Sequence, residues 1–457
     1  MTLVMQDRPT KSTPRAAGRI AHVLGWYFPE ALGGTEIYVA GLSHRMQAAG
    51  WDVRIAAPLP GEPDGREYEH DGVPVFRYPI PPNPTRDECR GTAPVRGAEV
   101  FHCWLGKIQP DIVHFHTFST GIGPREVTAA RESGARVFAT THLPALGYLC
   151  QRGTMLRWGE ELCDGICRPA KCAACSLHQR GAPKPLARVV GGMPGLASEL
   201  LGRMPGRSGT MLGMNGQIRR NLRMQNQILR DVEKYVVLTQ WAYDAMIHND
   251  APPEKVVLNR LGHGHVSVTR KPSPDARPTR TPVRFGFVGR LNAVKGADIL
   301  ARAVASLPRS LPFTVEFCGP TVPGGGRSVE TQLLEILGDD PRVTFREPVA
   351  PCDVPDLLAS YDVLVIPSLW LEGGPTVAIE AQAVGTPIIG TPMGGLAELV
   401  TNGVDGRHVP PRDIAELAVA MRTVVEDPGE IDRWRTALPA ARTMDDVTRD
   451  YLELYRG

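Results

Sequence analysis

The sequence has no apolar run approaching the roughly 20 residues that cross a bilayer, which argues against a membrane-spanning protein. It also has little excess charge. The 51 Lys and Arg nearly balance 49 Asp and Glu, and the net charge of +2 gives no reason to expect a nucleic-acid partner. The N-terminal stretch MTLVMQDRPTKSTPRAAGR is polar and basic and lacks the apolar core of a signal peptide. We therefore expect a cytoplasmic protein.

The composition is that of a globular protein, with 42% hydrophobic and 22% charged residues. A chain of 457 residues is too long for one ordinary core, so two domains are expected. In both halves, short apolar strands alternate with amphipathic helices, a pattern typical of α/β domains with mainly parallel sheets. Because such sheets bind ligands beyond the carboxyl ends of their strands, we predict two doubly wound, Rossmann-like domains that face a cleft.

A proline-rich polar stretch and the helical pattern at the end divide the chain into segments. The stretch TRKPSPDARPTRTP is polar, carries four prolines and has no periodicity, which is typical of a linker. The last helical pattern is expected to cross back onto the first domain. The predicted segments are a leader (1–18), an N-terminal domain (19–268), the linker (269–282), a C-terminal domain (283–430) and the final helix (431–457).

The second half contains PSLWLEGGPTVAIEAQAVGTPII, in which Glu372 and Glu380 bracket a glycine turn formed by Gly373 and Gly374. A helix is predicted from about Pro375, since proline suits the first helical turn. The free N–H groups and positive dipole end of such a helix form a site for an anion such as a diphosphate. The two acids would accept hydrogen bonds from sugar hydroxyls. The alternative is an ordinary helix with solvated acids.

Two cations, Arg290 and Lys295, follow a predicted strand in FVGRLNAVKGADIL. At the mouth of a sheet they would neutralise a phosphate pair and stabilise a departing diphosphate. Taken singly, each could be an ordinary surface cation. Together with the glycine turn and its two acids, they indicate a phosphate site.

The first half offers a glycine turn and three histidines. Gly33 and Gly34 precede a predicted helix and would let the backbone approach a diphosphate, although a plain tight turn is equally compatible with them. No Gly-x-Gly-x-x-Gly is present, so dinucleotide binding is poorly supported. DIVHFHTF places His114 and His116 on one face of a strand at its carboxyl end, and His142 ends the next strand. A buried structural histidine is the alternative for each.

These motifs resemble the retaining, nucleotide-sugar-dependent glycosyltransferases of family 4, which have the GT-B fold. The matching stretches are FVGRLNAVKG, YDVLVIPSLWLEGGPTVAIEAQAVGTPIIGTPMGGLAELVTNGVDG and, less sharply, GGTEIYVAGLSHRM. The resemblance covers roughly residues 19–430. It implies a sugar donor linked to UDP or GDP, with UDP weakly preferred, and a carbohydrate or lipid-linked acceptor, as in bacterial glycan or polysaccharide synthesis.

The resemblance also implies roles for individual residues. Arg290 and Lys295 would hold the donor phosphates, Glu372 the transferred sugar, and Glu380 the ribose. His116 would lie nearest the donor sugar, with His142 and His114 on the acceptor side. Further donor contacts would come from Gly33, Gly34, Gly373, Gly374, Pro375 and Thr376. No Asp-x-Asp is present, in agreement with catalysis that needs no metal cofactor, because cations and a helix end would replace Mg²⁺.

Retention of configuration ordinarily suggests a carboxylate nucleophile, but no acid in the first half stands out for that role. The resemblance favours attack on the same face, with the departing phosphate taking the acceptor's proton. The alternatives are a sugar phosphorylase or a sugar-nucleotide epimerase of the same fold, and a metal-binding or glycan-binding scaffold without activity. Intact Arg290, Lys295, Glu372 and Glu380 argue against the scaffold.

A cysteine-rich insert, at about residues 148–180, is not part of the family pattern. Five of the nine cysteines lie in it, which is dense for a cytoplasmic chain. The segment has few large apolar residues, so thiolates around a tetrahedral ion would supply the missing stability. Structural zinc is the first interpretation, an iron–sulfur cluster the second, and a redox disulfide or free thiols the alternative. The expected ligands are Cys150, Cys163, Cys172 and Cys175, with Cys167 as a substitute.

The stretch after the insert is rich in Arg, Met and Gly and is expected to form amphipathic helices beside the acceptor site. Its arginines could contact a bilayer that carries a lipid-linked acceptor, which makes peripheral membrane contact one hypothesis. A solvated basic face is the alternative. The arginines concerned are Arg203, Arg207, Arg219, Arg220 and Arg223.

Overall fold

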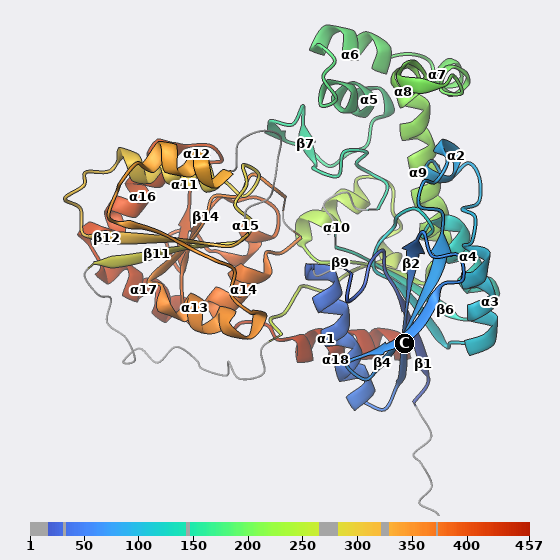
Figure 1. The fold of residues 1–457 in the computed structure, drawn as a ribbon, viewed down its shortest axis with the longest axis horizontal. Helices are drawn as coiled ribbons and strands as arrows, with labels where there is room; N and C mark the ends of the chain where they lie inside the picture. The colour runs from blue at the N-terminus through green and yellow to red at the C-terminus, as the bar shows by residue number, and fades with distance from the viewer. Residues whose placement is uncertain (1–16, 31–32, 143–146, 265–281, 321–328, 372) are drawn as a thin grey trace, which may run out of the picture.

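The chain folds into two α/β domains, each built on a mainly parallel sheet, as the alternating pattern predicted (Figure 1). The domains lie side by side, and a helical lobe projects from the first. The computed structural model describes residues 17–30, 33–142, 147–264, 282–320, 329–371 and 373–457.

The first domain has an eight-stranded sheet in the order β10-β9-β6-β5-β1-β2-β4-β3. All neighbours are parallel except β3 and β4, which form an antiparallel pair that the sequence pattern did not reveal. The strands are β1 (Arg19–Val23), β2 (Asp52–Pro60), β3 (Arg66–His70), β4 (Val73–Ile80), β5 (Ile112–Phe115), β6 (Arg136–Thr141), β9 (Lys234–Val237) and β10 (Val256–Leu258).

Helices cover both faces of this sheet, so its central strands are buried on both sides. Along β5, Ile112 packs in the core that includes Tyr38 of α1, whereas the next residue, Val113, packs with Phe101 of α3. This is the alternation of a pleated strand between two helical layers. The helices are α1 (Gly34–Ala48), α2 (Arg86–Cys89), α3 (Glu99–Ile108), α4 (Pro124–Glu132) and α10 (Gln240–Ile247).

The helical lobe follows β6 and contains the cysteine-rich insert (Figure 1). It begins with a short hairpin, and five helices follow, the last of which packs back against α4. The elements are β7 (Leu156–Arg157), β8 (Glu161–Leu162), α5 (Pro169–His178), α6 (Lys184–Gly191), α7 (Gly195–Leu201), α8 (Gly206–Leu212) and α9 (Met214–Asp231).

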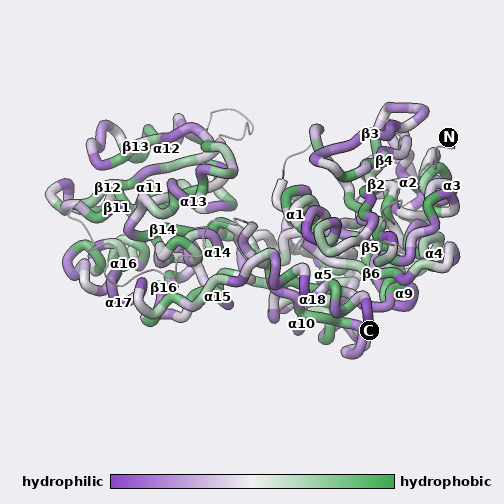
Figure 2. The backbone as a smooth tube through the Cα atoms, turned by 90° about the horizontal axis from the view of Figure 1, so that it is seen from below, coloured by the Kyte–Doolittle hydropathy of each residue, from purple (hydrophilic) through white to green (hydrophobic). Residues whose placement is uncertain are grey.

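The second domain has an all-parallel sheet in the order β13-β12-β11-β14-β15-β16. Its helices also lie on both faces, and Figure 2 shows hydrophobic segments along the strands of both sheets. The strands are β11 (Val283–Val288), β12 (Phe313–Cys318), β13 (Val343–Arg346), β14 (Val363–Ile366), β15 (Ile388–Gly390) and β16 (Gly406–His408). The helices are α11 (Ala297–Ser306), α12 (Val329–Leu337), α13 (Val354–Ser360), α14 (Thr376–Ala383), α15 (Gly395–Leu399), α16 (Ile414–Glu426) and α17 (Gly429–Ala437).

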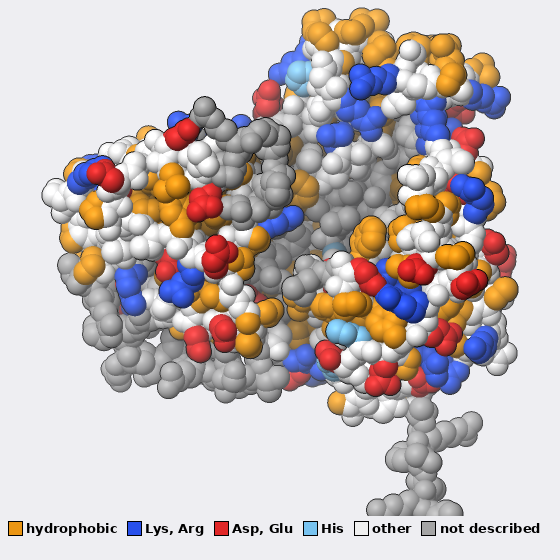
Figure 3. Space-filling model, viewed as in Figure 1, with side chains coloured by type: hydrophobic (Ala, Val, Ile, Leu, Met, Phe, Trp, Pro, Cys, Tyr) orange, Lys and Arg blue, Asp and Glu red, His pale blue; other side chains and the backbone are white. Residues whose placement is uncertain are grey.

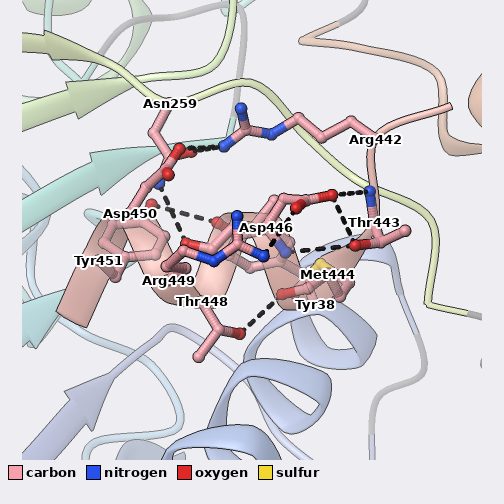
Figure 4. Close-up of polar contacts among 11 residues, drawn as sticks. Tyr38, Asn259, Arg442, Thr443, Met444, Asp446, Thr448, Arg449, Asp450 and Tyr451 are labelled. Carbon is pink, nitrogen blue, oxygen red and sulfur yellow. Dashed lines mark hydrogen bonds and ion pairs between the residues drawn. The ribbon is translucent and has the colours of Figure 1, made fainter. Parts of the chain in front are cut away.

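The last helix, α18 (Met444–Arg456), packs against α1 of the first domain (Figure 4). It begins at a capping box, in which Thr443 and Asp446 satisfy each other's backbone N–H groups. The hydroxyl of Tyr451 lies 3.1 Å from that of Tyr38 and 2.9 Å from Thr140 Oγ1. Buried hydrogen bonds therefore join the end of the chain to the face of the first sheet.

A carboxylate from the second domain caps a helix of the first. Glu398 of α15 accepts the N–H groups of Gln240 and Trp241, both at 2.9 Å, and pairs with Arg260 at 3.0 Å. Gln240 and Trp241 are the first two residues of α10, whose N–H groups have no partner within the helix. The negative charge also suits the positive end of the helix dipole. Among the described helices, none is both long and apolar enough to span a membrane.

Candidate active site

The predicted site residues follow the strands at which each sheet reverses its order. In the first sheet the order runs outward in both directions from β1 and β5, and in the second from β11 and β14. In open α/β sheets, ligands bind beyond the carboxyl ends of the strands at such a reversal. The loop after β1 carries Gly33, that after β5 carries His116, that after β11 carries Lys295, and that after β14 leads to Gly373.

The turn before α1 has one constrained and one open glycine. At Gly33, which caps the helix, an added Cβ would lie 2.6 Å from Glu36 Oε2. At Gly34, no described atom lies within 4 Å of the corresponding position. The backbone at Gly34 therefore borders open space, and the approach of a diphosphate to it stays a prediction.

The histidines form a hydrogen-bonded series that runs from the sheet interior toward the cleft. Nδ1 of His22, in β1, lies 2.9 Å from Nε2 of His116, and Nδ1 of His116 lies 3.2 Å from Nε2 of His142. His22 and His116 are completely buried, whereas His142 is half-buried. The ring of Tyr38 meets that of His142 edge-on. His142 is thus the member of the series nearest to solvent.

The structure corrects the expectation that His114 lines the acceptor side. His114 and His116 do share one face of the strand, with their rings stacked 4.3 Å apart. However, His114 is completely buried and hydrogen-bonded to Tyr455 and, at 2.7 Å, to Thr140 Oγ1. Because α18 covers this face, His114 has a structural role. The alternative interpretation, a satisfied core histidine, is the right one here.

All four histidines are neutral at physiological pH. Burial lowers the pKa of His22 and His142 to about 3, and burial with neighbouring histidines lowers the pKa of His114 and His116 well below the ordinary value. In the described part of the chain, His22, His114 and His116 form the group that could hold a metal ion, because one ring nitrogen of each lies within 4.8 Å of the others. Each ring nevertheless already takes part in a hydrogen bond, so the group has a ready structural explanation.

In the second domain, the loop after β11 holds the two predicted cations. Arg290 is exposed and Lys295 is half-buried. The loop packs against the segment that follows β14, since the N–H of Leu369 donates to the carbonyl of Val294 at 2.8 Å. Gly296 has a positive φ of 76°, and a side chain there would clash with the carbonyl of Pro367. These contacts place Lys295 beside the segment that leads to the glycine turn.

The start of α14 lies within one residue of the predicted helix start. Pro375 caps the helix and Thr376, which is exposed, is its first residue. Gly374 has a φ of 110°, which only glycine adopts readily. Glu380 lies in the second turn and is half-buried. Glu372 lies outside the described residues.

The glycine turn faces the first domain. A Cβ added at Gly373 would lie 3.1 Å from the carbonyl oxygen of His142, and one at Gly374 would lie 3.0 Å from Leu261. The structure therefore brings His142, Gly373 and the start of α14 together across the domain boundary. A cavity of about 160 Å³ lies next to this contact, and Gly374, Thr239 and Glu398 are among its lining residues.

The five cysteines of the insert converge on one cavity of about 430 Å³ in the helical lobe. All five are half-buried and none forms a disulfide. No three of these sulfurs lie within 4.8 Å of one another. The sequence spacing therefore predicted that the five cysteines come together, but not how far apart their sulfurs lie.

Sequence reasoning missed two residues of the site region. His22 was included only as part of a buried strand, although a histidine among apolar residues in RIAHVLG was a signal of a buried polar partner. Glu398 gave no signal, because it resembles any surface acid until the two domains meet.

Two family descriptions together match most of the chain. The glycosyl transferase 4-like domain matches residues 33–262, and glycosyl transferases group 1 matches residues 272–439. Curated relatives include the D-inositol 3-phosphate glycosyltransferase of Corynebacterium kroppenstedtii, 33% identical over 219 residues that cover 44% of this chain and 48% of the relative. That of a Nocardioides species is 27% identical, with 93% of this chain and 85% of the relative covered. The chain spans about half the length of the first curated relatives that it matches.

Solved structures share the arrangement of the two domains. Sucrose-phosphate synthase from Thermosynechococcus elongatus has a TM-score of 0.63 at 20% identity, with 96% of this chain and 98% of that chain covered. Anabaena HepE in complex with UDP has a TM-score of 0.61 at 17% identity, with 96% and 99% covered. At these identities the likeness concerns the fold alone, and with the family matches it confirms the predicted resemblance. The chain belongs to the glycosyl transferase 4-like family and has the two-domain GT-B fold.

Proposed function

We propose that the chain is a hexosyltransferase-type glycosyltransferase, of EC class 2.4, that moves a sugar from a UDP- or GDP-linked donor to an acceptor hydroxyl with retention of configuration. The observation that carries the proposal is the placement of the loop of Arg290 and Lys295 beside the segment that leads to α14, with the glycine turn facing His142. A donor that spans this boundary would have its diphosphate in the second domain and its sugar toward the first.

The diphosphate would bind at the start of α14. Exposed N–H groups at a helix start, together with two cations, stabilise negative charge in place. The same groups would stabilise the charge that builds on the leaving diphosphate. This arrangement supports catalysis without a metal ion in the active site. Glu380 would accept from the ribose hydroxyls and Glu372 from the sugar, as the family resemblance implies.

The histidine series would serve the sugar side of the cleft. His142 is half-buried and therefore able to contact a ligand directly, whereas His116 holds it from behind. Neutral imidazoles suit this role because they can orient a sugar hydroxyl without repelling positive charge at the anomeric carbon. His116, the predicted nearest neighbour of the sugar, would act through His142 in this arrangement.

The reaction would break the bond between the anomeric carbon and the phosphate oxygen and form a bond from that carbon to the acceptor oxygen. The proton of the acceptor hydroxyl would pass to the departing phosphate oxygen on the same face. No carboxylate nucleophile of the protein takes part. A trapped covalent glycosyl–enzyme intermediate would contradict this route.

The acceptor is a carbohydrate or a lipid-linked sugar in bacterial glycan synthesis. Peripheral membrane contact is supported by exposed apolar side chains on α6 and α7, of which Val189 and Leu196 are 74% and 81% exposed. Arg203 and Arg207 are exposed nearby, and Figure 3 shows hydrophobic and basic side chains together on this lobe. Apolar side chains flanked by cations suit an anionic lipid surface.

The test is a transfer assay with a panel of UDP- and GDP-sugars. Acceptors would include D-inositol 3-phosphate, because the curated relatives are named for it. Each assay is run with and without EDTA, and NMR assigns the anomeric configuration of the product. We expect acceptor-dependent release of nucleoside diphosphate, unchanged by EDTA, and a product of the donor's configuration. Turnover that needs free phosphate, or no acceptor at all, would favour a phosphorylase or an epimerase instead.

A further inference from the structure

We propose that the cysteine cavity of the helical lobe is a metal centre in which cysteine thiolates, Cys172 and Cys175 among them, hold a zinc ion or an iron–sulfur cluster. The five thiols come from three separate parts of the insert: the stretch before β7, the stretch between β8 and α5, and α5 itself. They nonetheless line a single cavity of about 430 Å³. This inference does not depend on the proposed catalytic function.

Two of the sulfurs already accept the hydrogen bonds that a metal-bound thiolate requires. Cys172 Sγ accepts from the backbone N–H of Arg168 at 3.3 Å, and Cys175 Sγ accepts from that of Trp158 at 3.2 Å. The amide of Gln179 donates to Cys175 Sγ as well, at 3.3 Å. Such donors stabilise a thiolate and orient it toward a metal. As a thiol, Cys175 also donates to the carbonyl of Leu156 at 3.6 Å, a contact that it would give up as a thiolate.

The walls of the cavity are strongly basic. Five cationic side chains line it and only one acidic side chain, Asp164, does so. Four thiolates around Zn²⁺, or four thiolates on a cluster, leave a net negative charge on the centre. The surrounding cations would offset that charge. They are Arg152, Arg157, Arg168, Lys171 and Arg188.

The spacing of the sulfurs bears on the kind of centre. Zn–S bonds of about 2.3 Å in a tetrahedron place the sulfurs about 3.8 Å apart. Here no three sulfurs are mutually within 4.8 Å, so a single zinc ion would draw them inward. A cluster of several iron and sulfide atoms is larger than one ion and would meet the sulfurs closer to where they stand. Both occupants use the same thiolate chemistry.

The centre would hold the insert against the helix that meets the second domain. Asn249, just after α10, accepts from the N–H of Cys167 at 2.7 Å and donates to the carbonyl of Gly165 at 2.8 Å. At its other end α10 is capped by Glu398 of the second domain. The metal centre and the domain contact therefore act on opposite ends of one helix.

The test uses the full chain, expressed with added zinc and iron and purified without chelators and without oxygen. Zinc, iron and acid-labile sulfide are measured per chain, together with the visible absorption spectrum. We expect about one zinc per chain, or iron with labile sulfide and a broad visible absorption. The first result identifies a zinc site and the second a cluster. Less than about 0.1 equivalent of either metal would overturn the proposal.

Matched variants locate the centre. Cys172→Ser and Cys175→Ser should each lower metal content at least about tenfold, whereas Cys103→Ser, on the exposed face of α3, should leave it unchanged. If the ligand variants fail to fold, thiol titration of the wild-type chain decides. Exposed Cys89, Cys103 and Cys352 should react at once, and the thiols of the insert only after the metal is removed. Immediate reaction of the insert thiols in the metal-loaded chain would overturn the proposal.

Discussion

Nε2 of His142 lies 3.2 Å from Nδ1 of His116, so a half-buried histidine beside the domain boundary is hydrogen-bonded to a completely buried one. His116 is in turn bonded to His22, whose Nε2 has no partner among the described residues. Because each neutral ring has one N–H, both hydrogen bonds must point the same way along the series. Either His22 donates to His116 and His116 donates to His142, or both donations are reversed. A buried ring nitrogen without a partner costs less free energy as an acceptor than as an N–H, so the proton of His22 belongs on Nδ1. His22 then donates to His116 and His116 to His142, which leaves the proton of His142 on Nδ1.

Replacement of His142 by Ala should lower kcat/KM for transfer by about 10² to 10³, with a small effect on folding. The side chain is half-buried, so its loss removes a ligand contact more than it removes packing. Steady-state kinetics measure the effect, and His102→Ala, on the exposed surface of α3, is the matched control. Equal kcat/KM for both variants would show that His142 does not contribute to transfer.

Stability should rise with pH between about 5 and 6.5 and level off above. The folded histidines have a pKa well below the ordinary value, so in this range the unfolded chain binds protons that the folded chain does not. Each such histidine contributes about 1.4 kcal/mol per pH unit. Glu126 acts in the opposite direction, because burial raises its pKa to about 7, but it offsets only one proton.

Denaturant unfolding at several pH values measures this dependence. His22→Phe keeps an aromatic side chain, with a somewhat larger ring, and removes one titrating group, so it should reduce the slope by about one proton. A stability that falls as pH rises from 5 to 6.5 would contradict the burial of neutral histidines.

Glu398→Ala should lower the free energy of unfolding by about 1 to 2 kcal/mol, because two N–H groups at the start of α10 lose their acceptor. Glu398→Gln retains an acceptor and should cost less. Glu426→Ala, an exposed acid of α16, is the control. Denaturant unfolding gives the three values. If Glu398→Ala unfolds like Glu426→Ala, the cap between the domains contributes nothing.

Tyr451→Phe should destabilise the chain by about 1 to 2 kcal/mol, because it removes two buried hydrogen bonds, to Tyr38 and Thr140. Thermal unfolding measures the change. Tyr243→Phe, on α10, serves as a comparison for the loss of a hydroxyl that is not completely buried. Equal unfolding temperatures would show that the two hydrogen bonds of Tyr451 contribute nothing to the attachment of α18.

The sequence was sufficient to predict the parallel strands and the glycine turn that leads into α14. Apolar runs such as DVLVIPS are continuous because both faces of the strand are buried. The turn before α14 needs a residue with positive φ, which is why a glycine, Gly374, stands there. The start of the helix was placed one residue early, since Pro375 caps the helix instead of beginning it.

The features that could not be predicted from the sequence depend on the register of strand pairing and on contacts between distant parts of the chain. His22 and His114 are partners across β1 and β5, 92 residues apart, and nothing local specifies that pairing. The burial of His114 depends on α18, which comes from the far end of the chain. The β3–β4 hairpin was missed because REYEH is an edge strand with mostly exposed side chains and little hydrophobic pattern.

Binding of UDP and GDP, measured by isothermal titration calorimetry, tests the central claim most directly. The wild-type chain is compared with Lys295→Ala and Arg290→Ala, and with Arg302→Ala on the exposed face of α11 as the control. We expect one of the two nucleotides to bind the wild type and the control alike, and to bind each of the other variants about 10 to 100 times more weakly. Equal affinity in all four proteins would contradict a diphosphate site between these cations and the start of α14.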